Sequence, residues 1–566
     1  IAVAILGLNY LLNLYNEKFV DVNSKDYIIE QFTKENIGNK KYFKQHGNVI
    51  GDKDYVILDD NNVEEYIYTT NNTWMPNGKI EIERIGNETG VEIKNVEVPN
   101  KSLDNKNISY EKVVCKNYYL GNKVFIVNKN TKLGKIIHVA KDINDIQHTL
   151  YNYRKHIQAN DICTTNVTNM SGMFNDEPMF NQPLNNWDTS NVTNMSSMFS
   201  GARQFNQPLN SWDTSNVTNM SSMFNFALSF NQPLDNWNTS NATNMSSMFS
   251  EAVQFNQPLN SWDTSNVTNM SSMFSVAIKF NQPLDNWNTS NVTNMSSMFS
   301  GATEFNQPLD NWDTSKVENM HSMFYAARQF NQPLNSWDTS KVKDMDSMFR
   351  DAVQFNQPLN SWDTSNVTNM KNMFSGATEF NQPLNSWDTS NVTNMSSMFN
   401  FALSFNQPLD NWNTSNVTNM KNMFSKAVQF NQPLNNWNTS NVKDMDSMFS
   451  LAESFNQPLN NWNTSNLTNM SYMFSLAKSF NQPLNSWDTS NVKDMNSMFR
   501  DAVQFNQPLN SWDTSNVTNM KNMFSGATEF NQPLDTWDTS KLENKEEMFF
   551  GTKYYEQKPV SAFDNF

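Results

Sequence analysis

The sequence is poor in the residues on which most catalytic and metal sites depend. Its 566 residues include two cysteines, Cys115 and Cys163, too few and too far apart for a disulfide scaffold or a zinc motif. They could pair with each other, but we favour two buried thiols. No phosphate-binding loop or nucleophile motif occurs, so we predict that the chain is not an enzyme and has no catalytic, cofactor-binding or metal-binding residue. The histidines show no ligand spacing; they are His46, His138, His148, His156 and His321.

Long hydrophobic runs are also missing. Apolar character is uninterrupted only from Ile1 to Leu8 and ends at Asn9, well short of the roughly 20 residues that span a bilayer. Residues 1–16 therefore have two interpretations. They are the remainder of a signal or membrane anchor, or they are an apolar element packed against the domain that follows.

Positive charge is scarce in most of the chain. The formal net charge is -16, and up to residue 158 the 21 Lys and Arg residues balance 20 Asp and Glu residues. The remainder carries 19 basic against 36 acidic residues, so the negative charge resides there. Nucleic acid needs a basic face, so this distribution argues against a nucleic-acid partner. It suits a soluble, exposed surface or a cationic partner.

The sequence is rich in repetition. The stretch from Phe180 to Phe199 reads Phe-Asn-Gln-Pro-Leu-Asn-Asn-Trp-Asp-Thr-Ser-Asn-Val-Thr-Asn-Met-Ser-Ser-Met-Phe, and its Phe-Asn-Gln-Pro-Leu word recurs with a fixed 25-residue period through Phe530. A fixed period of this length is the signature of a stacked repeat. Ordering one such unit costs more entropy than its few large apolar side chains return, so neighbouring coils must share a core. We therefore predict a solenoid over residues 162–556.

Each unit has the pattern of a helical turn followed by a short strand. Residues 188–190 supply side-chain oxygens of the kind that cap a starting helix. Pro208 ends the helical segment, and Leu209 and Trp212 fit a short strand. The residues before the proline that follow helical spacing are Val192, Met195, Met198 or Phe199, and Ala202. The predicted fold class is thus an α/β repeat solenoid of helix–strand coils.

Two polar positions of the repeat invite specific interpretations. The Asn and Gln after the first Phe can form a ladder that bonds to the backbone of the next coil, or they can belong to an exposed turn; we favour the ladder. The Asp188 position is Asp ten times and Asn five times, as at Asn238. Loss of charge suits a hydrogen-bond acceptor at a turn or helix start better than a calcium ligand, so we predict a cap.

The methionines and tryptophans of the repeat could suggest a copper site or an aromatic cage. All but one of the 16 tryptophans share one repeat position, with Trp74 the exception, and Met195 and Met198 recur in the same way. Such regular spacing is typical of a core, where methionine is a flexible filler. Variation gathers just before and after the Met-Phe pair, and around the constant Ala202 the residues at 200–204 change freely. We predict that these variable positions face solvent.

The region before the array reads as a small β-rich leader domain, residues 17–140. Asn77-Gly78 precedes the alternating residues 79–85 and predicts a tight hairpin, as does Gly121-Asn122 between two apolar runs. A further strand is expected at 136–139. Residues 141–161 then form a predicted capping helix over the open end of the solenoid. Its apolar stripe consists of Ile143, Ile146, Leu150, Tyr153 and Ile157. Ile162, in the later tryptophan position, indicates a modified first coil.

The array weakens at its other end. Lys545 replaces the first methionine, and Tyr555 and Lys558 stand where Phe and Pro would be. This pattern predicts a terminal capping coil in which 548–550 and 554–555 close the core. Residues 557–566 are a C-terminal tail.

The repeat motif resembles that of the BspA-like leucine-rich-repeat surface-protein family, of the type associated with mycoplasma lipoproteins. The resemblance rests on the pattern Phe-Asn-Gln-Pro-Leu-x-x-Trp-Asp-Thr-Ser-x-Val-x-x-Met-x-x-Met-Phe, which covers about residues 162–556. The resemblance implies a leucine-rich-repeat-like array exposed on a cell or particle surface and used in adhesion or host interaction. It brings no catalytic motif.

Two functions fit these features. The first is adhesion or recognition by a surface-exposed, N-terminally anchored protein whose long multivalent array contacts a protein or glycan on a host or neighbouring cell. The alternative is a structural spike, fibre or minor component of a virion or cell envelope. The location expected for the first is the cell surface or extracellular space, with the membrane as a possible contact of residues 1–16. The location expected for the second is the virion surface.

Overall fold

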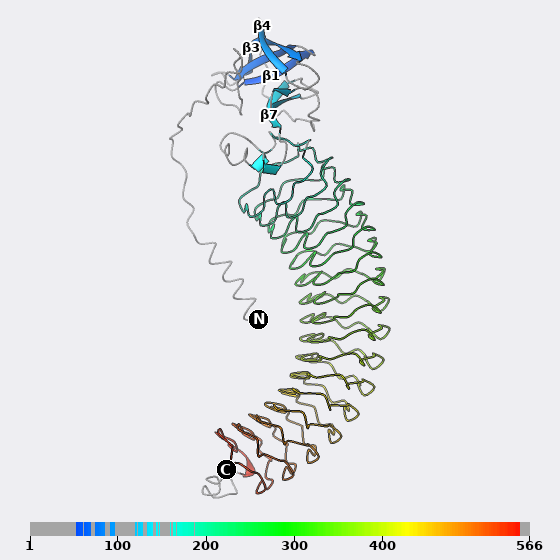
Figure 1. Ribbon diagram of the computed structural model, residues 1–566, viewed down its shortest axis with the longest axis vertical. Coiled ribbons are helices and arrows are strands. Elements are labelled where there is room, and N and C mark those ends of the chain that lie inside the picture. The colour runs from blue at the N-terminus through cyan, green and yellow to red at the C-terminus, as the bar shows by residue number, and fades with distance from the viewer. Residues whose placement is uncertain are drawn as a thin grey trace.

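The protein consists of a β-sheet followed by a long stack of coils, as the computed structural model shows in Figure 1. The structure describes residues 53–59, 62–68, 74–84, 91–96, 119–120, 123–127, 133–139, 143–144, 146–147, 159, 162–165, 167–185 and 187–554. The predicted apolar segment 1–16, the Cys115 thiol, the Cys163 side chain and the tail 557–566 lie outside what is described. In Figure 1 the coils follow one another along an arc, from cyan to red.

The strands before the array form one sheet with the order β4-β3-β2-β1-β7-β6-β5, and the pairs along this path are antiparallel. The alternation of β-branched or aromatic residues with charged ones, as in Lys79-Ile80-Glu81-Ile82, is the pattern that favours such strands. The strands are β1 (Lys53–Asp59), β2 (Asn62–Tyr68), β3 (Trp74–Arg84), β4 (Val91–Val96), β5 (Tyr119–Leu120), β6 (Lys123–Val127) and β7 (Leu133–Val139).

Of the two predicted hairpins, one is confirmed and one is wrong. Leu120 pairs with Lys123, so β5 and β6 form the predicted hairpin, and the connecting Gly121-Asn122 lies outside the described residues. The Asn77-Gly78 pair makes no hairpin, because β3 continues straight through it. Gly78 pairs with Glu65 and Pro76 with Tyr66, which leaves one residue more on β3 than on β2. This shift is a β-bulge, where a residue that tolerates unusual φ is as useful as in a turn.

The sheet and the array are joined by β8 (Ile162–Cys163), which pairs in parallel with the end of β7. Residues 143–144 and 146–147 are helical, and Ile146 is fully buried against the core of the array. The Ala159 carbonyl accepts a hydrogen bond from Trp187 Nε1, at 2.8 Å. Ile162 is also buried, as predicted for a modified first coil. The rest of the predicted capping helix, including Leu150, Tyr153 and Ile157, lies outside the described residues.

The coils consist of turns, so the predicted helix and strand are wrong. Between Thr164 and Thr552 the described residues form no helix and no strand, only isolated parallel bridges such as Asn194 with Asn219. The supposed helix is interrupted by Ser197, whose φ is 55°. The supposed strand is a turn in which the Trp212 amide donates to the Leu209 carbonyl, at 3.0 Å. The fold is therefore a repeat solenoid of successive turns.

These turns explain why the sequence resembled a helix. Within a coil, hydrogen bonds run three residues back, from the Met198 amide to Met195 O, from Ala202 to Phe199, and from Phe205 to Ala202. Turns that close every three or four residues place the same side chains inward as a helix would. The amides of residues 195, 197, 199 and 201 bond to the next coil instead, as from Ser197 to the Ser221 carbonyl at 2.8 Å. A helix would have kept them within the segment.

Equivalent side chains stack from coil to coil through one continuous core. We call the set of residues that share one repeat position a row and name it after its member in residues 181–205. The Trp187 row is 0–3 % exposed in all coils but the last, and its neighbours stack nearly parallel. The core prediction for tryptophan and methionine is therefore confirmed. The other rows buried in the complete coils are those of Leu184, Val192 (Ala242 and Leu467 in two coils), Met195, Met198, Phe199, Ala202 and Phe205.

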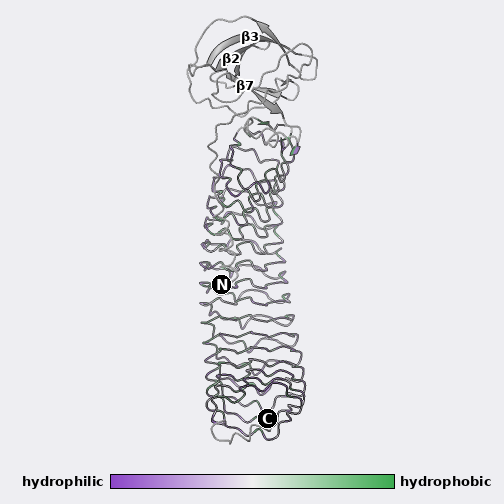
Figure 2. Cartoon of the chain, turned by 90° about the vertical axis from the view of Figure 1, so that its left-hand side faces the viewer, coloured by the Kyte–Doolittle hydropathy of each residue, from purple (hydrophilic) through white to green (hydrophobic). Residues whose placement is uncertain are grey.

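The stack is curved because its two sides have different spacings. Backbone hydrogen bonds from 195, 197, 199 and 201 to the next coil hold one side at about the 4.8 Å of paired strands. On the tryptophan side, neighbouring ring centroids lie 6.2 Å (Trp237–Trp262) to 6.5 Å (Trp212–Trp237) apart. The hydrogen-bonded ladder must then lie on the inside of the arc. Figure 2 looks onto this inner side and shows the coils as nearly parallel rungs.

The C-terminal coil closes the core much as predicted. Met548, Phe549 and Tyr554 are at most 5 % exposed, whereas Phe550 is 65 % exposed. Tyr554 packs against Phe530, with ring centroids 6.3 Å apart, one residue earlier than the repeat register had indicated. Tyr555 lies outside the described residues.

Candidate interaction surface

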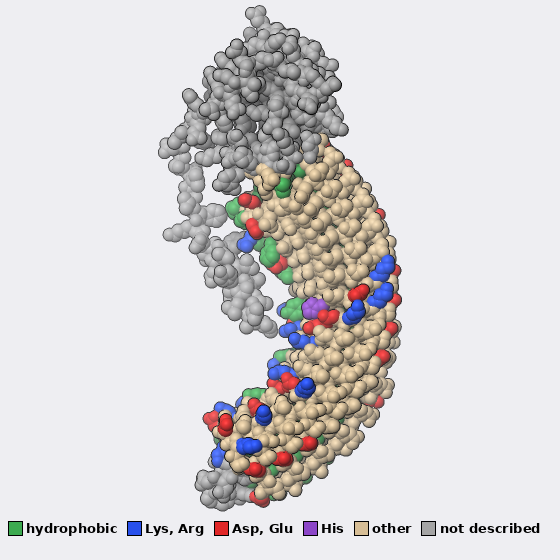
Figure 3. All heavy atoms as spheres, in the orientation of Figure 1, with side chains coloured by type: hydrophobic (Ala, Val, Ile, Leu, Met, Phe, Trp, Pro, Cys, Tyr) green, Lys and Arg blue, Asp and Glu red, His purple; other side chains and the backbone are tan. Residues whose placement is uncertain are grey.

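The variable positions of the repeat lie together on the inner side of the arc. We call this surface the ladder face; it consists of the outward residues of the Ser196, Ser197, Ser200, Gly201, Arg203 and Gln204 rows. Figure 3 shows hydrophobic and charged side chains gathered along this concave edge, whereas most of the remaining visible surface is of other types. The prediction that residues around Ala202 face solvent is confirmed, since Arg203 and Gln204 are exposed and Ala202 is buried.

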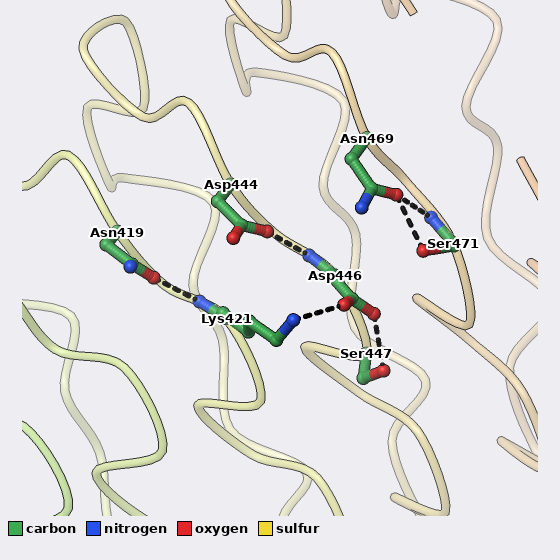
Figure 4. A network of polar contacts seen from close by, with 7 residues as sticks. All are labelled: Asn419, Lys421, Asp444, Asp446, Ser447, Asn469 and Ser471. Atoms are coloured by element: carbon green, nitrogen blue, oxygen red, sulfur yellow. Dashed lines mark hydrogen bonds and ion pairs between the residues drawn. The ribbon is translucent and has the colours of Figure 1, made fainter. Parts of the chain in front are cut away.

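Each ladder-face segment starts at a side chain that holds the backbone in a turn. Oδ1 of Asn194 accepts a hydrogen bond from the Ser196 amide, at 3.0 Å. The same bond recurs at Asn419, Asp444 and Asn469 in Figure 4, so Asp serves as well as Asn. Side chains of the Ser196 row are thereby fixed in line and can contact each other across coils.

Charged side chains on this face pair across neighbouring coils. Lys421 Nζ lies 2.6 Å from Oδ2 of Asp446, whose other oxygen accepts from Ser447 Oγ (Figure 4). The hydrogen bond to Asp446 raises the pKa of the Lys421 amine above its ordinary value. Other pairs that cross one coil boundary on this face are Lys279–Glu304, Lys478–Glu453, Lys521–Glu546 and Lys553–Glu529. The face thus carries both signs of charge in fixed positions.

The Gly201 row combines left-handed backbone with bulky side chains. Five of its sixteen members are glycine, yet Phe226, Val276, Phe401 and Leu451 occupy the same conformation with φ between 56° and 60°. The ladder imposes this φ, because the row's amide donates to the next coil, as from Phe401 to Ser425 O at 2.9 Å. L-residues other than Gly, Asn and Asp are disfavoured there by roughly 1–2 kcal/mol. Phe226 and Phe401 are nevertheless 39 % and 43 % exposed.

Glu251, in the same row, is expected to destabilise the fold in two ways. Its φ is 58°, and burial raises the pKa of its carboxyl above 4.5. A raised folded-state pKa favours folding below the unfolded pKa, and this benefit is lost as pH rises through the folded value. Glu251→Gln should therefore raise the urea midpoint at pH 7 but not at pH 3. Glu251→Gly should add about 1 kcal/mol at pH 3 by removing the φ strain, and more at pH 7, where it also removes the buried charge. A gain for Gln that is equal at both pH values would contradict the burial argument.

The Asn-Gln ladder lies away from the ladder face, on the side of the coil where the spacing between coils is wider. The prediction that these side chains bond to the neighbouring coil is confirmed. Oδ1 of Asn206 accepts from the Asn231 amide and from Gln232 Nε2, both at 3.0 Å. The same bonds link nearly every pair of neighbouring coils from Asn181 to Gln532. These residues are part-buried between coils, so they hold the stack together.

The Asp188 row caps a turn, as an acceptor, with no helix following it. Oδ1 of Asp263 accepts from the Ser265 amide at 2.9 Å, and Asn238 makes the same bond to Ser240 at 3.1 Å. The predicted interchange of Asp and Asn is thereby explained. Hydrogen bonds from the serine two residues on hold the pKa of several of these carboxyls below its ordinary value. They are Asp263, Asp313, Asp388, Asp513 and Asp538.

Acid should weaken the array partly through this row. A depressed folded-state pKa contributes stability above the unfolded pKa, and the contribution is lost as pH falls through the folded value. We expect the midpoint of thermal unfolding to fall between pH 4 and pH 2. A variant with Asp263, Asp313 and Asp388 all changed to Asn should fall less, because Asn accepts the same bond without titrating. Circular dichroism at pH 7, 4 and 2 checks this, and equal losses in both proteins would contradict it.

Two other kinds of site have little support from the geometry. Among the residues that the structure describes, no group of three or more His, Cys, Asp or Glu side chains is placed to hold a metal ion. The Asn191 row contains glycosylation sequons, but its amide nitrogen is already a donor to the preceding coil, as from Asn216 Nδ2 to Ser190 O at 2.7 Å.

The array extends over the same residues as a known repeat family. Six overlapping segments match the family described as Mycoplasma protein of unknown function, DUF285. They are residues 144–262, 232–335, 253–362, 304–411, 378–481 and 454–563. The chain belongs to the DUF285 family. The DUF285 match begins at residue 144, before the first coil, and includes every coil. It leaves the strands β1 to β7 outside.

Beyond this DUF285 match, no curated protein is similar to the sequence. The structure also bears on the membrane. In the described part of the chain, no helix has the length and apolar character required to cross a bilayer.

Sequence reasoning found the ladder face only in part. It identified the variable positions from their changes between copies. It missed the left-handed backbone of the Ser197 and Gly201 rows, although Gly and Asn recur there, as at Gly376 and Asn372. Repeated Gly and Asn at one position are the signal for positive φ.

Proposed function

We propose that this protein is a surface-exposed recognition or adhesion protein. In this proposal its array projects from a cell and contacts a protein or glycan on a host or neighbouring cell through many similar coils. The observation that supports it is the division of the coil surface. The ladder face varies in charge, size and aromaticity, whereas the Asn-Gln ladder and the Asp188 row vary little. Structural demands alone would not concentrate the variation in size and aromaticity on one face.

Repetition of the variable segments supports multivalent contact. Asn225–Ser229 recurs as Asn400–Ser404, and Arg350–Leu384 recurs without change as Arg500–Leu534. Each copy presents the same side chains on the same face. Weak sites linked on one stiff body gain strength together when a partner also repeats. The relationship to the BspA-like surface proteins, inferred from the repeat motif, fits this function.

The proposal is tested by location and binding. Immunogold labelling of cells or particles of the source, with antibody against the array, should mark the outer surface. The purified chain should bind to neighbouring or host cells and should compete with whole-cell adherence. Label confined to the interior, or no binding to any cell, would contradict the proposal. Label within an ordered particle shell would favour the structural alternative, a spike or minor envelope component.

A further inference from the structure

We propose that the bulky members of the Gly201 row are the contact residues for a protein partner seated on the concave ladder face. The inference rests on the proposed recognition function and deepens it by naming the face, the residues and the class of partner. The members concerned are Phe226, Val276, Phe401, Lys426, Leu451 and Leu476.

The first argument is energetic. Glycine fits this row without strain, as Gly201 and Gly301 show with φ of 73° and 70°. Asp, which also tolerates left-handed backbone, occupies it three times, at Asp176, Asp351 and Asp501. Phe, Val and Leu therefore occupy the row at a cost to stability. Strain of this kind is typical of positions retained for function.

The second argument is that these side chains add little to the fold. Phe401 is 43 % exposed, and its ring contacts Lys426 of the next coil, whose Nζ lies 3.9 Å from the ring centroid. Neither Phe401 nor Lys426 is part of the buried core beneath them. The core residue next to them, Ala402, is fully buried and the same in every complete coil.

The third argument concerns the chemistry of the partner. Aliphatic residues adjoin the aromatic ones, with Leu228 two residues after Phe226 and Leu403 two residues after Phe401. Cross-coil ion pairs such as Lys478–Glu453 lie on the same face. Apolar anchors bordered by charges of both signs are typical of protein interfaces. A glycan would use aromatic rings and amides but would gain little from leucine or valine. The partner is therefore a protein with apolar pockets beside charges of both signs.

The face also repeats its anchor. The segment Asn-Phe-Ala-Leu-Ser occurs at 225–229 and at 400–404, seven coils apart. A partner with two equivalent subunits or repeats would contact both segments at once. Loss of one anchor should then weaken binding, and loss of both should weaken it more than either single loss.

The experiment compares three proteins. The first is the unchanged chain. The second carries Phe226→Gly and Phe401→Gly, and the third carries Asn236→Ser and Asn411→Ser. Asn236 and Asn411 are exposed residues of the same coils on another side, and serine already occupies their row at Ser211. Two probes are used: a library of short random peptides displayed on phage and selected on the unchanged chain, and a glycan array to which each of the three proteins is applied.

We expect selected peptides with apolar anchors that bind the Phe226/Phe401 variant at least tenfold more weakly than the other two proteins. The urea midpoint of this variant, followed by tryptophan fluorescence, should be unchanged or higher. Failure to enrich such peptides, or equal binding to all three proteins, would overturn the inference. The inference would also be overturned if the Phe226/Phe401 variant had a lowered urea midpoint or if glycan binding depended on the two phenylalanines. Self-association of the chain that is abolished by their loss would overturn it too. Cell binding that persists in this variant would leave the proposed function standing and remove this face from it.

Discussion

Trp362→Ala should lower the free energy of unfolding by about 3–5 kcal/mol, the largest effect expected for a single substitution. Trp362 is 3 % exposed and stacks between Trp337 and Trp387, with ring centroids 6.4 Å and 6.3 Å away. Its Nε1 donates to the Leu334 carbonyl at 2.9 Å. The substitution removes contacts on both sides and leaves that buried carbonyl without its side-chain donor. Urea unfolding followed by circular dichroism measures the loss.

The position of the tryptophan in the stack provides the control. Trp537 is 8 % exposed and, within the described residues, stacks only on Trp512. In a linear array each coil depends on its neighbours, so a break in the middle uncouples two halves, whereas a break at the end frees only the last coils. Hydrogen exchange should therefore increase around Met345 and Met370 in Trp362→Ala and stay unchanged there in Trp537→Ala. Equal losses of stability in the two variants would contradict the shared-core account.

Asn356→Ala should lower the free energy of unfolding by about 2 kcal/mol, the middle of the range for an unsatisfied buried donor. Oδ1 of Asn356 accepts from the Asn381 amide at 3.0 Å and from Gln382 Nε2 at 2.9 Å. Alanine leaves the part-buried amide of Asn381 without its acceptor. Urea unfolding measures this effect as well.

The matched control is Asn356→Asp, which keeps the acceptor oxygen and the size of the side chain. Within the described residues Nδ2 of the Asn356 side chain donates no hydrogen bond, so the aspartate should cost much less than the alanine. A comparable loss in both variants would show that the ladder bond contributes little and that packing of the side chain matters more.

The core and the ladder could be predicted from sequence because each follows from one repeated residue. A Trp or Met recurring at one position of every unit must stack on its copies, and a recurring Asn next to proline needs a partner that the adjacent coil offers. The local backbone could not be predicted in this way. Spacings of three and four residues belong equally to a helix and to a chain of turns, and only the alternation of hydrogen bonds between Met195 and Gly201 distinguishes them.

Short motifs failed for a related reason. Asn77-Gly78 indicated a hairpin because both residues tolerate positive φ, but a bulge in β3 uses the same tolerance. The hairpin predicted at Gly121-Asn122 did form, since β5 and β6 pair on either side of it. Residues that tolerate positive φ indicate that the strand is irregular at that point. The pairing with distant strands decides whether the irregularity is a turn or a bulge.

Because the boundaries between coils are so alike, the number of coils can change by mutation without loss of the fold. Any coil can follow almost any other, so unequal recombination between the tandem copies would yield longer or shorter proteins that still fold. At one kind of boundary the neighbours are matched: a Cβ at Gly376 would lie 2.2 Å from Oδ1 of Asp351, whose side chain would have to move, and the duplicated block carries the pair again as Asp501 and Gly526. Populations of the source should therefore contain variants that differ by whole repeat units, with this Asp-Gly pair inherited together.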